Sequence, residues 1–133
     1  PDDLGYLDQW GHLHVVGRSS QKIITGGENV FPSEVEAALL ATGLIRDVCV
    51  MGVPDRLWGE AVAALYVADQ SVTPQQLRAA LTGSLSAYKH PKRWRSVEHI
   101  PRNDQGKVSR PQVRAWLSES TELARGSTDD AGG

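Results

Sequence analysis

Lys107 is the residue in this sequence that is best placed to do chemistry. It follows the segment Asn103-Asp104-Gln105-Gly106, whose residue types favour tight turns and left-handed backbone. A lysine at the tip of such a turn has a fixed base and a long reach, which suits contact with a phosphate or carboxylate on another surface. This segment alone leaves one alternative open, an ordinary solvated turn lysine.

Two other segments could contact a ligand through their shape. Gly26 and Gly27 allow a backbone conformation or a close ligand approach that a side chain would block, and a tight strand-to-helix turn is the alternative. No Gly-Lys-Ser or Gly-Lys-Thr ends this segment, so it is not a phosphate-binding P-loop. Trp58 precedes Gly59 in a polar turn and could stack on a ligand, whereas a half-buried core tryptophan is the alternative.

A basic and aromatic loop is expected at residues 88–94. Its cationic side chains could bind phosphates, and a solvated basic turn is the alternative. Between Tyr88 and Trp94 these side chains are Lys89, His90, Lys92 and Arg93.

Composition excludes several kinds of partner. A length of 133 residues suits one domain, and a net charge of −2 gives no overall attraction to nucleic acid or anionic membranes. Cys49 is the single cysteine, and no signal peptide or membrane-length apolar stretch is present, so we expect a cytoplasmic chain. The histidines lack partners at metal-ligand spacing, and we expect no metal ion on this chain. Because residues 1–3 read as the middle of a protein, we expect a fragment of a longer chain.

These residues must be positioned by a small α+β fold. Short apolar runs bounded by turn residues predict a β-hairpin within residues 4–16 and strands near 22–25, 47–53, 61–68 and 95–99, and the continuous run at 47–53 indicates a buried strand. Helices are predicted from Pro32, from Thr73 as N-cap with Gln76 in a capping box, and over residues 110–117. We expect the helices to pack on a three-stranded sheet.

Taken together, these segments resemble the C-terminal domain of the adenylate-forming enzymes, which include acyl- and aryl-CoA ligases, luciferase and nonribosomal-peptide adenylation domains. The resemblance covers residues 3 to about 117 and depends on four motifs in the family's order. They are Asp3-Leu4-Gly5-Tyr6-Leu7-Asp8 with Gly17-Arg18, the stretch from Gly26 through Glu36, Pro54-Asp55 with Trp58-Gly59-Glu60, and Pro101 with Gly106-Lys107.

The resemblance implies a ligase reaction in two steps. A carboxylate first attacks the α-phosphate of ATP to give an acyl-adenylate, and CoA then forms the thioester and releases AMP. The C-terminal domain rotates between the steps relative to a large N-terminal domain, which would hold most of the ATP site and its Mg²⁺. The resemblance also implies domain limits. Residues 1–17 would hold the end of the preceding domain and a hairpin, 18–21 a hinge, 22–117 the C-terminal domain and 118–133 a mobile tail.

The resemblance also assigns roles to single residues. Lys107 corresponds to the adenylation lysine, while Asp3, Arg18 and Asn29 correspond to residues near ATP or AMP. Ser20 occupies the hinge position, where the family commonly has Asp or Lys. The residues expected near CoA are Gly26, Gly27, Trp58, Tyr88 and His90.

Ser20 and the Gly-Gly-Glu-Asn segment resemble o-succinylbenzoate-CoA ligases of menaquinone or phylloquinone synthesis. The run Arg46-Asp47-Val48-Cys49-Val50 and the segment Trp58-Gly59-Glu60 are most similar to the cyanobacterial members of that group. This similarity implies o-succinylbenzoate as the acid, and the fragment by itself would be inactive. Two alternatives remain: an amino-acid adenylation domain that serves a carrier protein, and a binding module without catalysis.

Overall fold

The computed structural model describes residues 5–7, 13–15 and 21–119. Near the N-terminus, β1 (Gly5–Leu7) pairs antiparallel with β2 (Leu13–Val15), as the predicted hairpin requires. The rest of the described chain contains five strands, three α-helices and a short 3₁₀ helix. In order these are β3 (Ile23–Thr25), β4 (Glu28–Val30), α1 (Pro32–Ala41), β5 (Asp47–Asp55), β6 (Gly59–Val67), α2 (Pro74–Leu81), η2 (Ala87–Lys89), β7 (Arg93–Ser96) and α3 (Arg110–Glu119).

The centre of the fold is the long antiparallel hairpin β5–β6. All nine residues of β5 are paired, from Asp47 opposite Val67 to Asp55 opposite Gly59. The other edge of β6 is shared: β7 pairs with it in parallel, and the β3–β4 hairpin joins it through Thr25 and Gly59. Because parallel strands need a crossover, the chain from β6 to β7 passes through α2.

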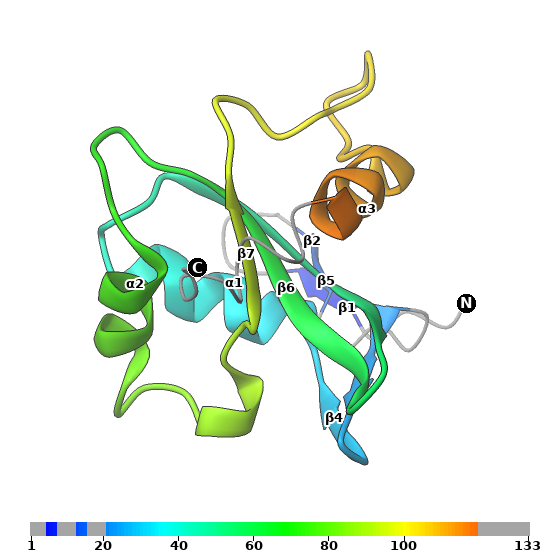
Figure 1. Cartoon of the computed structure of the whole chain (residues 1–133). Helices are drawn as coiled ribbons and strands as arrows, with labels where there is room; N and C mark the ends of the chain where they lie inside the picture. The colour runs from blue at the N-terminus through cyan, green and yellow to red at the C-terminus, as the bar shows by residue number, and fades with distance from the viewer. Residues whose placement is uncertain (1–4, 8–12, 16–20, 120–133) are drawn as a thin grey trace.

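Helices cover both faces of this sheet, so β5 and β6 are apolar at successive positions rather than alternate ones. Helices α1 and α2 lie on one face and α3 lies on the other (Figure 1). Val50 and Val62 face the core formed with α1 and α2, while Met51 and Leu65 face the core formed with α3. The result is a three-layer sandwich with two apolar cores.

Local sequence signals explain where two helices begin. The Thr73 hydroxyl accepts a hydrogen bond from the Gln76 amide at 3.1 Å, and the Gln76 side chain accepts one from the Thr73 amide at 2.8 Å. This confirms the predicted capping box at the start of α2. Pro32 occupies the first turn of α1, where its missing N–H costs no helical hydrogen bond.

The α+β class is confirmed, but the main sheet is larger than expected. Within the described residues it has five strands rather than three. Strand β4 was not predicted, because it has only three residues and is stabilised by its pairing with β3. Strand β7 begins at Arg93, two residues before the predicted strand, since Arg93 and Trp94 are drawn into the buried edge beside β6. No helix in the described part of the chain is long and apolar enough to cross a bilayer.

Candidate functional site

The turn that carries Lys107 is closed by its own hydrogen bonds. The Asn103 side-chain oxygen accepts from the amides of Gln105 at 2.8 Å and Lys107 at 3.0 Å. The Asn103 amide donates to the Lys107 carbonyl at 2.8 Å, and the Gly106 amide donates to the Asn103 carbonyl at 2.9 Å. Gly106 has a φ of 84°, a left-handed value that glycine adopts without strain. Lys107 itself is exposed, so its ammonium group projects from a fixed base.

This turn lies where β5 begins. The Arg102 guanidinium, one residue before the turn, forms an ion pair with Asp47 at 3.0 Å. Asp47 is the first residue of β5. The Lys107 turn is therefore attached to the Asp47 end of the central hairpin.

Trp58 occupies the turn at the other end of the same hairpin. One oxygen of Asp55 accepts hydrogen bonds from the amides of Leu57 at 2.8 Å and Trp58 at 2.9 Å. The Trp58 carbonyl accepts from the Gly26 amide at 2.9 Å. A Cβ added to Gly26 would come within 2.8 Å of the Trp58 ring, whereas one added to Gly27 would meet nothing within 4 Å. Gly26, Gly27 and Trp58, which the sequence separates widely, thus form one cluster.

Two basic residues from β7 and its approach complete this cluster. The Lys92 ammonium lies 4.7 Å from the centre of the Trp58 ring, a cation–π distance. Burial lowers the pKa of Lys92. Arg93 forms an ion pair with the second oxygen of Asp55, and these side chains are only 4% and 5% exposed. The buried Asp55–Arg93 ion pair therefore fixes the Trp58 turn, and Lys92 covers one face of the Trp58 ring.

The predicted basic loop does not form one phosphate-binding patch. Lys89 pairs with Glu34 at 2.8 Å, and the His90 ring hydrogen-bonds the Leu85 carbonyl at 3.0 Å. Arg93 is buried, and Lys92 covers Trp58. Each of the four basic side chains thus has a separate partner. Tyr88 remains 40% exposed beside Lys89.

The Lys107 turn and the Trp58 cluster lie at opposite ends of the sheet. A nine-residue strand spans about 26 Å, and Asp47 and Asp55 are the two ends of β5. Figure 1 shows the yellow-to-orange segment before α3 at one end of the molecule and the β4 hairpin at the other. No single ligand of ordinary size reaches both groups at once, so they can act only on separate ligands or at separate times.

The other predicted site residues divide in the same way. Asn29 is exposed in β4, opposite Ile24, and so belongs to the hairpin of Gly26 and Gly27 rather than to the Lys107 turn. The alternative interpretation of Gly26 and Gly27 as a strand-to-helix turn is wrong, because β4 follows them. Trp58 is half-buried, at 39% exposure, but it lies at a turn and belongs to neither apolar core. Asp3, Arg18 and Ser20 lie outside the described residues.

Sequence reasoning did not assign three residues to the Trp58 cluster, namely Asp55, Glu60 and Lys92. Asp55 accepts from amides two and three positions ahead, a turn pattern of aspartate that the sequence could have revealed. The Glu60 carboxylate accepts from the Ile24 amide at 2.8 Å and joins the two hairpins. Lys92 reaches Trp58 only through the fold. No local signal indicates either of these long-range contacts.

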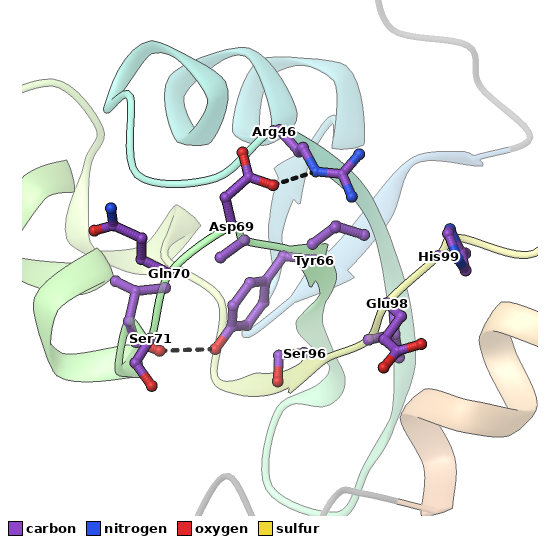
Figure 2. Close-up of a pocket in the computed structure, with 12 residues that line it drawn as sticks. Arg46, Tyr66, Asp69, Gln70, Ser71, Ser96, Glu98 and His99 are labelled. Carbon is purple, nitrogen blue, oxygen red and sulfur yellow. Dashed lines mark hydrogen bonds and ion pairs between the residues drawn. The ribbon is translucent and has the colours of Figure 1, made fainter.

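A polar depression of about 650 Å³ lies near the Asp47 end of the sheet. Arg46 and Asp69 form an ion pair across 2.6 Å there, and the Tyr66 hydroxyl donates to the Val72 carbonyl at 3.4 Å. Figure 2 shows Arg46 and Asp69 turned toward each other, with Glu98 and His99 on the other side. Because the guanidinium and the carboxylate neutralise each other, this pair offers no net charge to a ligand in the depression.

Cys49 is not placed to act as a nucleophile. It is buried in the core beneath α3, and burial raises the pKa of its thiol to about 12. Among the described residues there is no group of three or more His, Cys, Asp or Glu side chains arranged to hold a metal ion.

Comparison with known proteins agrees with this arrangement. A family model described as the AMP-binding enzyme C-terminal domain matches residues 34–107. An uncharacterised acyl-CoA ligase, YhfT of Bacillus subtilis, is 37% identical over 121 residues, which is 91% of this chain and 25% of that protein. A 2-succinylbenzoate-CoA ligase of Bacillus pumilus is 38% identical over 113 residues, or 85% of this chain and 23% of that protein.

The same similarity holds for a solved structure. A fatty acyl CoA synthetase of Mycobacterium tuberculosis superposes with a TM-score of 0.77 and 40% identity, covering 88% of this chain and 24% of that one. The chain thus spans about a quarter of the length of the relatives it matches. With the family model matching more than half of its residues, the chain belongs to the AMP-binding enzyme C-terminal domain family.

Proposed function

We propose that this chain works as the C-terminal domain of an AMP-forming acid–CoA ligase. In this proposal a longer protein joins a carboxylic acid to ATP as an acyl-adenylate and then transfers the acyl group to CoA. The observation that carries the proposal is the separation of two ligand-facing clusters at the Asp47 and Asp55 ends of β5. A two-step reaction can use such an arrangement by presenting one end of the domain in each step.

In the adenylation step Lys107 would approach the α-phosphate and the attacking carboxylate. Its exposed ammonium on a hydrogen-bonded turn supports this role. Charge that develops on the phosphate in the transition state would be stabilised by the ammonium, an effect worth about 10²–10³ in rate for one such contact. Asp3 and Arg18 would hold the ribose and Ser20 would be the hinge, with Mg²⁺ beside ATP on the N-terminal domain. Asn29, which the resemblance put near ATP or AMP, lies in the hairpin of Gly26 and Gly27 and would meet a ligand only when that end of the domain is presented.

In the thioester step the Trp58 cluster would line the path of the pantetheine arm. The exposed ring and the open Gly27 backbone support this role, because both leave room for an extended chain. Tyr88 and His90 would lie near the nucleotide end of CoA. Here Tyr88 is the better supported of the two, because its ring is exposed, whereas the His90 ring is engaged by Leu85.

The acid is proposed to be o-succinylbenzoate. The 2-succinylbenzoate-CoA ligase of Bacillus pumilus supports this choice, but the fatty acyl CoA synthetase is similar to the same degree. A panel of acids tested with the full-length enzyme would identify the substrate. Transfer to a carrier protein in place of CoA would favour the amino-acid adenylation alternative.

The decisive experiment is Lys107→Ala in the full-length enzyme. Adenylate formation should fall by about 10²–10³, while thioester formation from pre-made acyl-adenylate should stay close to wild type. Gln105→Ala is a matched control, since it alters an exposed side chain on the same turn and keeps the amide that bonds Asn103. Equal loss of both steps in Lys107→Ala would contradict the assigned role.

A further inference from the structure

The position of the Lys107 turn depends on more than its own hydrogen bonds. Those bonds give residues 103–107 a fixed shape, but they do not attach the turn to the sheet. An ammonium group that must meet a phosphate on another domain also needs a fixed direction. The contacts between the turn and the rest of the domain therefore decide how well Lys107 can act.

The stem of the turn is anchored in the core below α3. The Ser109 amide donates to the Pro101 carbonyl at 2.9 Å, and Arg102 and Val108 form an antiparallel bridge. Ile100 is 5% exposed, and Val108 packs against the same core. The two strands of the stem are thus held, and the turn beyond them extends into solvent.

Arg102 links this turn directly to β5. Its Nη2 lies 3.0 Å and 3.3 Å from the two oxygens of Asp47. Its Nη1 donates to the Gly106 carbonyl at 3.2 Å, and Gly106 is the residue immediately before Lys107. One planar guanidinium therefore connects the sheet and the turn, using two donors that a lysine ammonium could not hold in the same fixed geometry.

Asp47 is itself well fixed. Its backbone pairs with Val67 at the start of β5, and its Oδ1 accepts from the Val48 amide at 2.9 Å. Among the hydrogen bonds and ion pairs of the described residues, no other side-chain link joins residues 103–107 to the sheet. Beyond the anchored stem, the direction of the turn relative to β5 thus depends on the side chain of Arg102.

We propose that Arg102 and Asp47 are positioning residues for Lys107 in the adenylation step. This inference rests on the proposed function. The pair is partly exposed, with side chains 41% and 34% accessible, and ion pairs of this kind contribute little to folding stability. A misplacement of about 1 Å, by contrast, can cost about 10²-fold in rate. Loss of the pair should therefore slow one chemical step and leave the fold intact.

The test compares Arg102→Ala and Asp47→Asn in the full-length enzyme. Arg102→Ala should lower the single-turnover rate of adenylate formation by about 10- to 100-fold, with no change in thioester formation from pre-made acyl-adenylate. Asp47→Asn should slow the same step less, because the contact of Arg102 with Gly106 remains. Urea unfolding midpoints of both variants should stay close to wild type.

Asp69→Asn is the matched control. It removes another exposed carboxylate–arginine pair, with Arg46, at the same end of the sheet but away from the turn. It should leave both half-reactions unchanged. Loss of adenylation in Asp69→Asn equal to that in Asp47→Asn would overturn the inference, because the effect would then come from charge alone.

Two further outcomes separate this inference from the proposed function. If Lys107→Ala loses adenylation and Arg102→Ala keeps it, the positioning role is wrong and the ligase proposal stands. If Arg102→Ala slows both half-reactions equally, its role is structural and the inference is again overturned. A wild-type enzyme that forms no adenylate with any acid of the panel would overturn both.

Discussion

At the scale of single residues, Gly26 and Gly27 are neighbours with different constraints. Both have left-handed φ values, 58° and 84°, in the turn between β3 and β4. Only Gly26 faces Trp58, whose ring leaves no room for a Cβ. A substitution at Gly26 therefore affects both the turn and the tryptophan, while one at Gly27 affects the turn alone.

We expect Gly26→Ala and Gly27→Ala to separate these effects. Each should lower the free energy of unfolding by about 1–2 kcal/mol, because alanine is strained in the left-handed region. In the full-length enzyme Gly26→Ala should also raise the KM for CoA by displacing Trp58, and Gly27→Ala should do so less. Chemical denaturation and steady-state kinetics measure the two effects. If the KM for CoA were the same in both variants, the proposed contact between Trp58 and CoA would be contradicted.

At the scale of elements, helix α1 is linked to the edge strand β5 through one carboxylate, that of Glu36. Glu36 accepts a hydrogen bond from the Val50 amide at 2.8 Å. Burial raises the pKa of Glu36 from 4.5 to about 7, although that hydrogen bond and the nearby Arg110 act in the opposite direction. The packing of α1 on β5 is thereby coupled to pH.

The direction of this coupling is set by the raised pKa. The folded chain holds the Glu36 proton more tightly than the unfolded chain does, so its contribution to stability is complete below about pH 4.5 and is lost as pH rises through 7. Between pH 4.5 and 8 the loss should be about 2–3 kcal/mol, after allowance for partial exposure. Urea unfolding of the 133-residue chain across this range measures it.

Glu36→Gln should remove this pH dependence, since glutamine can still accept from Val50 and carries no charge. Glu98→Gln, which removes an exposed carboxylate of the polar depression, should retain the wild-type dependence. If Glu36→Gln loses as much stability as wild type over the same range, another group is responsible.

At the scale of the whole molecule, the described residues place the Lys107 turn and the Trp58 cluster at separate ends of the sheet rather than around one enclosed cavity. The Lys107 turn and the Trp58 cluster both face outward, about one β5 length apart. Each would form half of a site whose other half comes from another domain. A chain with only half of each site should bind its ligands weakly.

We therefore expect the 133-residue chain to be catalytically inert and to show no micromolar affinity for CoA or AMP. Isothermal calorimetry with each compound tests this, and the full-length enzyme is the positive control. Micromolar binding by the isolated chain would favour the alternative of an independent binding module. Turnover by the isolated chain would contradict the proposed division of the active site.

The local elements of this protein could be predicted from sequence because short-range signals specify them. Thr73 and Gln76 determine the start of α2, and Asn103 with Gly106 determines the turn before Lys107. The resemblance motifs likewise predicted a family that the comparisons confirm. The helix start and the turn each depend on residues a few positions apart, and each resemblance motif is a short stretch of the chain.

The tertiary structure alone decided how these features meet. Asp47 and Arg102 are 55 positions apart, yet they attach the Lys107 turn to β5. Arg93 and Lys92 were predicted to share a basic loop, but one is buried against Asp55 and the other covers Trp58. Such contacts follow from strand register and from which face of the sheet each helix covers, and no local pattern encodes them. For Lys107, the sequence determined that it stands on a turn, and the fold determined which end of the sheet it serves.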